Sequence, residues 1–190
     1  MTADDDRLIA ECLQGRTEAF GELVYRYQDR LYNTVYRLLG NAEDARDVVQ
    51  EACLHAYQAL DAFKHDSQFF TWLYRIAVNT AISWKRKHRA VLSLNSASAN
   101  AGLEPQDSSE SIQPGHALEQ AEQERRVQEA LTRLSPEHRA VLVLKDMEGE
   151  KYETMAEVLQ VPIGTIRSRL HRARLELRTL LEQQGQEKKA

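Results

Sequence analysis

Apolar side chains recur at steps of three and four along three segments of the N-terminal half, which is the pattern of amphipathic α-helices. Gly40 suits the left-handed conformation that follows a helix, so it ends the first segment. Asn41 then supplies an N-cap for the second, with Glu43 and Asp44 near the positive end of its dipole. The three stripes are Phe20, Leu23, Val24, Tyr27, Leu31, Val35 and Leu38; Ala45, Val48, Val49, Ala52, Cys53, Ala56 and Leu60; and Leu73, Ile76, Ala77, Thr80 and Trp84.

Four further helices are predicted in the C-terminal half. Ser135-Pro136-Glu137 is a helix start, with a serine cap, a proline at the first helical position and an acid in the first turn. This helix stops near Gly149, and Gln160-Val161-Pro162 separates a short helix from a final one that runs from about residue 164 into the region of residue 180. We expect a polar helix before residue 135 and a frayed charged tail after Gln183.

Residues 93–115 are rich in Ser, Asn, Ala, Gly, Gln and Pro and poor in bulky apolar side chains. Such a segment cannot bury enough surface to offset the entropy lost on ordering, which indicates a linker. The sequence therefore predicts an all-α fold of two small helical domains joined by a flexible linker. The expected boundaries are 1–92, 93–116 and 117–190.

The net charge of −4 hides a strong segregation of charge along the chain. Residues 67–103 and 162–175 contain no Asp or Glu, yet both stretches carry several Lys and Arg side chains. Binding to phosphate depends on local basic patches, so the overall negative charge does not exclude a nucleic-acid partner. Solvated charged faces are the alternative interpretation of the two stretches.

Other classes of protein find little support. Cys12 and Cys53 are too few for a disulfide framework or a zinc site, and buried thiols explain them. The chain shows neither a signal peptide nor an apolar run long enough to span a membrane, so we expect a cytoplasmic protein without membrane insertion. The histidines lack metal-ligand spacing and no phosphate-binding glycine loop occurs, so neither an enzyme nor a cofactor is expected. The acids Asp44, Asp47 and Glu51 could be grouped as a carboxylate cluster, but a charged helix surface explains them as well.

The last two predicted helices match the helix-turn-helix plan, in which the second helix enters the major groove of DNA. The apolar stripe of the final helix leaves Arg167, Ser168, His171, Arg172 and Arg174 on or near its other face. Arginine can bind guanine through two hydrogen bonds, and serine can contact bases or phosphate. A solvated basic face on a structural helix is the alternative.

A second candidate lies where aromatic and basic side chains alternate. Phe70, Trp72 and Arg75 precede Asn79 on one predicted helix, which continues into Lys85, Arg86 and Lys87. Aromatic rings stack with bases and cations neutralise phosphates, as in sites for single-stranded nucleic acid. Phe70 and Trp72 could equally be core residues.

At these residues the chain resembles bacterial sigma factors of the extracytoplasmic-function (ECF) group, a branch of the sigma-70 family. The segments 44–51 and 70–79 resemble region two, and the segment 164–174 resembles region four, in the order expected and with a linker between them. The resemblance implies a promoter-recognising subunit that binds core RNA polymerase and promoter DNA, with catalysis left to the polymerase. It also implies an anti-sigma factor as a regulatory partner.

The resemblance assigns three sets of residues. Polymerase contacts are expected from Asp44, Asp47, Gln50 and Glu51; minus-ten DNA contacts from Phe70, Trp72, Arg75, Asn79, Lys85 and Arg86; and minus-thirty-five DNA contacts from Thr165, Arg167, Ser168, His171 and Arg172. A transcription regulator with an N-terminal ligand-sensing domain is the main alternative, but it leaves the acidic helix and the aromatic-basic segment unexplained.

Overall fold

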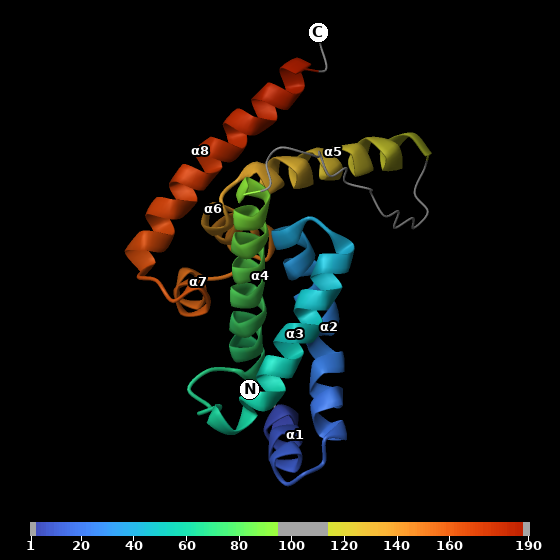
Figure 1. Cartoon of the computed structure of the whole chain (residues 1–190), viewed down its shortest axis with the longest axis vertical. Helices are drawn as coiled ribbons and strands as arrows, with labels where there is room; N and C mark the ends of the chain where they lie inside the picture. The colour runs from blue at the N-terminus through green and yellow to red at the C-terminus, as the bar shows by residue number, and fades with distance from the viewer. Residues whose placement is uncertain (1–2, 95–113, 188–190) are drawn as a thin grey trace.

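The computed structural model describes the backbone of residues 3–94 and 114–187, and the side chains of 4–88 and 121–186. Within these ranges every regular element is a helix and no strand occurs. This confirms the predicted all-α class. The helices form two units, α1–α4 and α5–α8, which pack against each other (Figure 1).

The N-terminal unit consists of α1 (Ala3–Leu13), α2 (Glu18–Leu39), α3 (Ala42–Gln58), the short 3-10 helix η1 (Leu60–Ala62) and α4 (Phe69–Leu94). Helices α2, α3 and α4 pack on one another, and α1 closes the end of α2. Asp5 anchors α1, because its carboxylate accepts hydrogen bonds from Arg26 and from the Tyr27 hydroxyl, the latter at 2.8 Å.

The turn between α2 and α3 forms as the sequence predicts. Gly40 takes a left-handed φ of 80° and donates its backbone N–H to Tyr36 O at 2.7 Å, ending α2. The side chain of Asn41 accepts from the backbone N–H of Glu43 and Asp44 at 2.8 and 3.0 Å, which caps α3. Local chemistry alone therefore fixes this corner.

The C-terminal unit consists of α5 (Pro114–Arg133), α6 (Pro136–Leu142), a π-helical turn η2 (Val143–Met147), α7 (Tyr152–Leu159) and α8 (Ile163–Glu187). The Ser135 hydroxyl accepts from the backbone N–H of His138 at 3.2 Å, confirming the predicted cap. Helices α5, α6 and α7 all pack on α8, so this long last helix is the common packing partner within the unit.

The C-terminal unit lies over α2 and α4. In Figure 1, α4 runs between α6 and α7 on one side and α2 and α3 on the other. The third predicted stripe is therefore incomplete: Tyr74, Val78 and Ala81 are buried too, while Ile76, Thr80 and Trp84 are half-buried. The sequence pattern missed these positions because α4 is covered by both units rather than by one.

Buried Arg139 on α6 holds the two units together. Its side chain is 1% exposed and donates hydrogen bonds to the backbone carbonyls of Leu131, in its own unit, and of Leu38, at 2.6 Å, in the other. Gln128 on α5 donates to Tyr36 O and Arg37 O at 3.4 and 3.3 Å. The last carbonyls of α2, which have no partner within the helix, thus receive donors from the C-terminal unit.

Two boundary predictions need comment. The frayed tail predicted after Gln183 is wrong for residues 184–187, because α8 continues to Glu187; residues 188–190 lie outside the described residues. Most of the linker predicted over 93–116 lies outside the described residues; at its two ends, α4 extends to Leu94 and α5 begins at Pro114.

Candidate nucleic-acid interface

Helices α7 and α8 form a helix-turn-helix. Gln160 ends α7 with a left-handed φ of 54°, and its backbone N–H donates to Ala156 O. Met155 and Val158 of α7 and Ile166 of α8 are fully buried, so the two helices are held at a fixed angle by a shared core. Such rigid packing is what a recognition helix needs to place its side chains in a groove.

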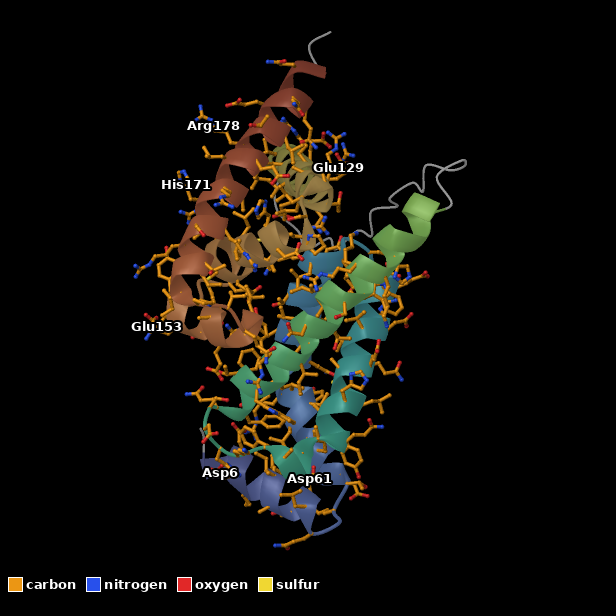
Figure 2. The ribbon with its side chains drawn as sticks, turned by 60° about the vertical axis from the view of Figure 1, so that its left-hand side comes forward. Asp6, Asp61, Glu129, Glu153, His171 and Arg178 are labelled. Atoms are coloured by element: carbon orange, nitrogen blue, oxygen red, sulfur yellow. The ribbon has the colours of Figure 1, made fainter. Side chains whose placement is uncertain are left out.

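The outer face of α8 carries the predicted minus-thirty-five residues. Arg167, Ser168, His171 and Arg172 are exposed, and Figure 2 shows His171 on the outer side of this helix. Thr165 is half-buried in the first turn, and its carbonyl accepts from the Ser168 hydroxyl at 3.0 Å. The structure therefore brings all five together on one accessible helical surface.

Tyr152 and Asp146 position two arginines of α8. The Arg167 guanidinium lies 5.7 Å from the centre of the Tyr152 ring, close enough for a cation–π contact. Arg174 donates two hydrogen bonds to Asp146, one of them from Nε at 3.0 Å, and this ion pair raises the pKa of the Arg174 guanidinium. Arg174 is thus paired with an acid of its own unit, although its side chain remains 53% exposed.

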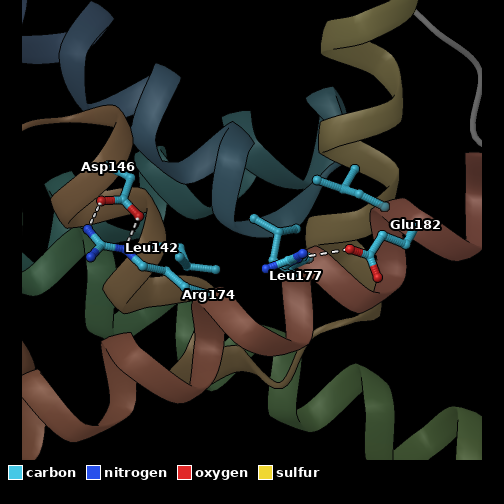
Figure 3. A pocket seen from close by; sticks show the side chains of 7 residues that line it. Leu142, Asp146, Arg174, Leu177 and Glu182 are labelled. Atoms are coloured by element: carbon cyan, nitrogen blue, oxygen red, sulfur yellow. Dashed lines mark hydrogen bonds and ion pairs between the residues drawn. The ribbon is translucent and has the colours of Figure 1, made fainter.

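Beside Arg174, α8 borders a shallow groove of about 380 Å³ (Figure 3). Leu142, Leu177 and Leu181 line its apolar part, and Asp146 and Glu182 mark its rim through ion pairs with Arg174 and Arg178. The groove lies farther along α8 than the exposed basic face, since Arg174 and Arg178 are two helical turns beyond Arg167 and His171. Its charged lining residues pair with one another at the rim, so they do not form a polar binding site inside the groove.

The aromatic residues predicted on α4 have different surroundings. Trp72 is 8% exposed, and its ring lies 5.1 and 5.8 Å from those of Phe63 and Phe69, inside the core. Phe70 is half-buried beside Tyr27 and Tyr74. Of the pair, Phe70 is thus the one at the surface.

Three polar residues predicted as minus-ten contacts on α4 make hydrogen bonds or ion pairs with other helices of the chain. Arg75 is half-buried, and Asn79 donates to Val158 O of α7 at 3.2 Å. Lys85 donates to Leu39 O at 3.1 Å. Arg86 binds the carboxylate of Glu137 on α6, with its Nε at 3.1 Å. Asn79 and Arg86, seven residues apart on one helical face, thus both contact the C-terminal unit, although the Arg86 side chain stays 61% exposed.

Glu137 responds electrostatically to this contact. Partial burial by itself raises the pKa of Glu137, but the hydrogen bond from Arg86, the backbone N–H and the charge of Arg169 together hold the pKa below its ordinary value. The carboxylate is therefore stabilised in its charged form in this arrangement of the two units.

The predicted polymerase-binding acids share one side of α3. Asp47 and Gln50 are exposed and Asp44 and Glu51 half-buried, with Glu51 Oε1 4.0 Å from His55 Nε2. Leu54, one turn beyond Gln50, is 56% exposed, so an apolar side chain continues the acidic face. The sequence could have indicated Leu54 as a candidate contact residue, because it is a leucine on the polar side of an amphipathic helix.

The structure also reveals residues that the sequence reasoning missed. Arg139 reads as one more surface arginine of α6, yet it is the buried centre of the contact between the units. Glu148 and Glu150, in the loop after η2, pair with Arg37 and Arg30 of α2 at 2.5 and 2.6 Å. No local pattern marks these residues, because their partners lie over a hundred positions away.

Two negative findings hold for the part of the chain that the structure describes. No group of three or more His, Cys, Asp or Glu side chains could hold a metal ion there. Within those same ranges, no helix combines the length and the apolar character needed to cross a bilayer.

Comparison with known families matches both units separately. Residues 23–91 match the family described as sigma-70 region 2, and residues 124–177 match sigma-70 region 4. Similar proteins include RNA polymerase sigma-H factor of Pseudomonas aeruginosa, 38% identical over 92% of either chain. ECF RNA polymerase sigma factor SigW of Bacillus subtilis is 35% identical over 91% of this chain and 94% of its own. ECF RNA polymerase sigma-E factor of Escherichia coli is 37% identical over 90% of both.

Solved structures show the same fold. CnrH, in complex with the cytosolic domain of CnrY, superposes with a TM-score of 0.64 at 29% identity, covering 94% of this chain and 97% of that one. The sigma factor RpoE of Bartonella quintana, in complex with the anti-sigma factor NepR, gives a TM-score of 0.67 at 24% identity, covering 86% and 96%.

A helix-turn-helix unit with an exposed basic face, joined to a second helical unit with its own basic helix, is typical of a DNA-binding protein of transcription. With both regions matched in order and relatives aligned over nine-tenths of its length, the chain belongs to the ECF group of the sigma-70 family. It is a promoter-recognising initiation factor, and the chemistry of transcription belongs to the polymerase rather than to this chain.

Proposed function

We propose that this chain binds core RNA polymerase through α3, contacts the minus-ten element through α4 and contacts the minus-thirty-five element through α8. The observation that carries the proposal is the exposed face of Arg167, Ser168, His171 and Arg172 on a helix-turn-helix. Arginine and serine at the start of a recognition helix suit bases and phosphates of the major groove.

The minus-ten contact is assigned to Phe70, Asn79 and Arg86, with Arg75 and Lys85 supporting the phosphate path. An aromatic ring at the surface can stack with an unpaired base, and an amide can bind its edge. Trp72 takes a positioning role in this proposal, because its ring supports the start of α4 from inside the core.

The polymerase contact is assigned to the acidic face of α3, namely Asp44, Asp47, Gln50 and Glu51. Exposed acids steer association with a basic partner, while an apolar neighbour such as Leu54 adds buried area once contact is made. We propose that the two DNA-binding units meet the linker near residues 92 and 117. We also propose a cytoplasmic location, since RNA polymerase and promoter DNA are found there.

An anti-sigma factor is proposed as a regulatory partner. The support is kinship: the relatives RpoE and CnrH were each solved with a second protein, and RpoE's partner is an anti-sigma factor. The chain's own residues do not identify which protein fills this role.

The test is in vitro transcription by core polymerase plus this chain on a promoter library. We expect transcripts that start at defined positions and that share sequence elements upstream. Asp47→Lys combined with Glu51→Lys should abolish polymerase binding, whereas Glu124→Lys combined with Glu182→Lys, two exposed acids of the other unit, should not. Absence of specific initiation with the wild-type chain would refute the function, and normal polymerase binding by the first variant would refute the α3 assignment.

A further inference from the structure

An acidic loop of the C-terminal unit is seated on two arginines of α2. Arg37 Nη1 lies 2.5 Å from Glu148 Oε1, and Arg30 Nη2 lies 2.6 Å from Glu150 Oε1. Arg30 Nε is also 3.7 Å from Glu148 Oε2, so Glu148 is shared between the two guanidinium groups. Arg30 and Arg37 are two helical turns apart on one face of α2, which makes them a pair of cations in a row.

The two arginines are joined to the aromatic surface of α4. The Arg30 guanidinium lies 4.5 Å from the centre of the Phe70 ring and 5.8 Å from that of Tyr74. A guanidinium flat against an aromatic ring keeps its donors at the edge, where they can bind an anion. Phe70 is also the surface aromatic of the proposed minus-ten contact, so the arginine pair extends that contact onto α2.

The exposed fractions show which partner is inserted. The side chains of Glu148 and Glu150 are only 9% and 15% exposed, whereas those of Arg30 and Arg37 are 48% and 38% exposed. The acids therefore enter an arginine surface that is otherwise open to solvent. Because the arginine ends of these ion pairs stay open to solvent, a phosphate can approach them and compete with the two carboxylates.

The same C-terminal unit also contacts two other residues of the proposed minus-ten face. Asn79 donates to Val158 of α7, and Arg86 binds Glu137 of α6. Three acids of the C-terminal unit thus contact three arginines of the N-terminal unit, with Glu148 shared between Arg30 and Arg37. The phosphates of a DNA strand could take the places of these carboxylates, since arginine binds carboxylate and phosphate with the same geometry.

We propose that Arg30 and Arg37 on α2, with Phe70 beside them, form a further contact site for the phosphate backbone of single-stranded promoter DNA, which Glu148 and Glu150 occupy in the closed arrangement. When the C-terminal unit moves off α2 and α4, two phosphates replace the two carboxylates and an unpaired base stacks on Phe70. This inference rests on the proposed function and adds α2 to the DNA-binding surface.

The test compares three double variants of the full chain assembled with core polymerase. Arg30→Gln with Arg37→Gln removes the cations and keeps most of the side-chain stems. Arg16→Gln with Arg125→Gln is the control, because these two arginines also pair with carboxylates but lie elsewhere. Glu148→Gln with Glu150→Gln removes the occupying charges. The probe is a single-stranded oligonucleotide carrying the non-template minus-ten element of a promoter identified by transcription, titrated at several salt concentrations.

The site variant should bind the oligonucleotide about tenfold more weakly than the control. Its plot of log affinity against log salt should be shallower by about 1.4, since each phosphate contact to a single strand contributes about 0.7. For the free chain without polymerase, the Glu148/Glu150 variant should bind the oligonucleotide more tightly than wild type. The two variants therefore move affinity in opposite directions.

Other outcomes overturn the inference. If loss of Arg30 and Arg37 strengthens DNA binding, as loss of the acids does, the arginines only hold the two units together. If the arginine variant matches the control in affinity and salt dependence, no phosphate lies on α2. If wild-type chain forms no holoenzyme or fails to bind the oligonucleotide, the proposed function itself fails, which is a distinct result. Circular dichroism and thermal melting of each variant show that it is folded before it is scored.

Discussion

Replacing Arg139 by methionine should destabilise the protein by about 3 kcal/mol. Arg139 is 1% exposed and supplies charged donors to Leu131 O and Leu38 O. A hydrogen bond to a charged group contributes roughly 1.5–3 kcal/mol. Two such bonds give about 3–6 kcal/mol, and Leu131 O still accepts from the backbone N–H of Leu134 at 3.2 Å after the substitution, which places the loss near the lower end. The favourable burial of the methionine is subtracted from this sum.

The assay is urea unfolding followed by circular dichroism, with Arg133→Met as the matched control. Arg133 lies in the last turn of α5 and is exposed, so its replacement should change the free energy of unfolding by less than about 0.5 kcal/mol. Because Arg139 joins carbonyls of both units, small-angle scattering should also show a larger radius of gyration for Arg139→Met. Loss of under 0.5 kcal/mol, or an unchanged radius, would contradict the role assigned to this residue.

Three more predictions concern single positions. Gly40→Ala should destabilise the fold by more than about 1 kcal/mol, because a Cβ there would lie 2.7 Å from a methyl group of α5 and because φ is 80°. Gly15→Ala is the control, since Gly15 has a φ of 102° but open space around it and so reports the backbone contribution alone. Equal losses of stability in the two variants would show that the close approach to α5 is unimportant. Arg172→Ala should weaken minus-thirty-five binding by about 1–3 kcal/mol at one base pair, measured by competition with mutated promoters, and equal loss on all sequences would indicate a phosphate contact instead. Glu137→Gln should reduce stability near pH 7: the folded-state pKa of Glu137 is lowered, so its contribution is present above the ordinary pKa of 4.5 and is lost as pH falls through the folded value. The urea midpoints of wild type and Glu137→Gln should therefore begin to converge as pH falls below about 4.5 and should meet once pH is below the lowered pKa of Glu137; a gap that stays constant over this whole range would rule out the pair with Arg86 as its source.

The local features that sequence predicts well are those decided within a few residues. The ending at Gly40, the caps at Asn41 and Ser135 and the break at Gln160 all formed as expected, since each depends on one side chain and its nearest backbone groups. The outward face of α8 followed from helical periodicity alone, because the residues on its other side are buried within the same unit.

The surroundings of α4 show where this reasoning stops. Periodicity identifies a helix with one buried side, but α4 is packed by α2 and α3 on one side and by α6 and α7 on another. The sequence also could not separate Trp72, which is core, from Phe70, which reaches the surface, because both are aromatic neighbours at the start of one helix.

The sequence by itself determined the helical class, the order of the elements, the exposed basic face of α8 and the family. Only the tertiary structure decided that the two units close on each other, that Arg139 is buried between them and that Glu148 and Glu150 meet Arg37 and Arg30. The physical reason is range: caps and amphipathic stripes are set by neighbours within one or two helical turns. Pairings across a hundred residues depend on how complete surfaces fit together, which no local pattern encodes.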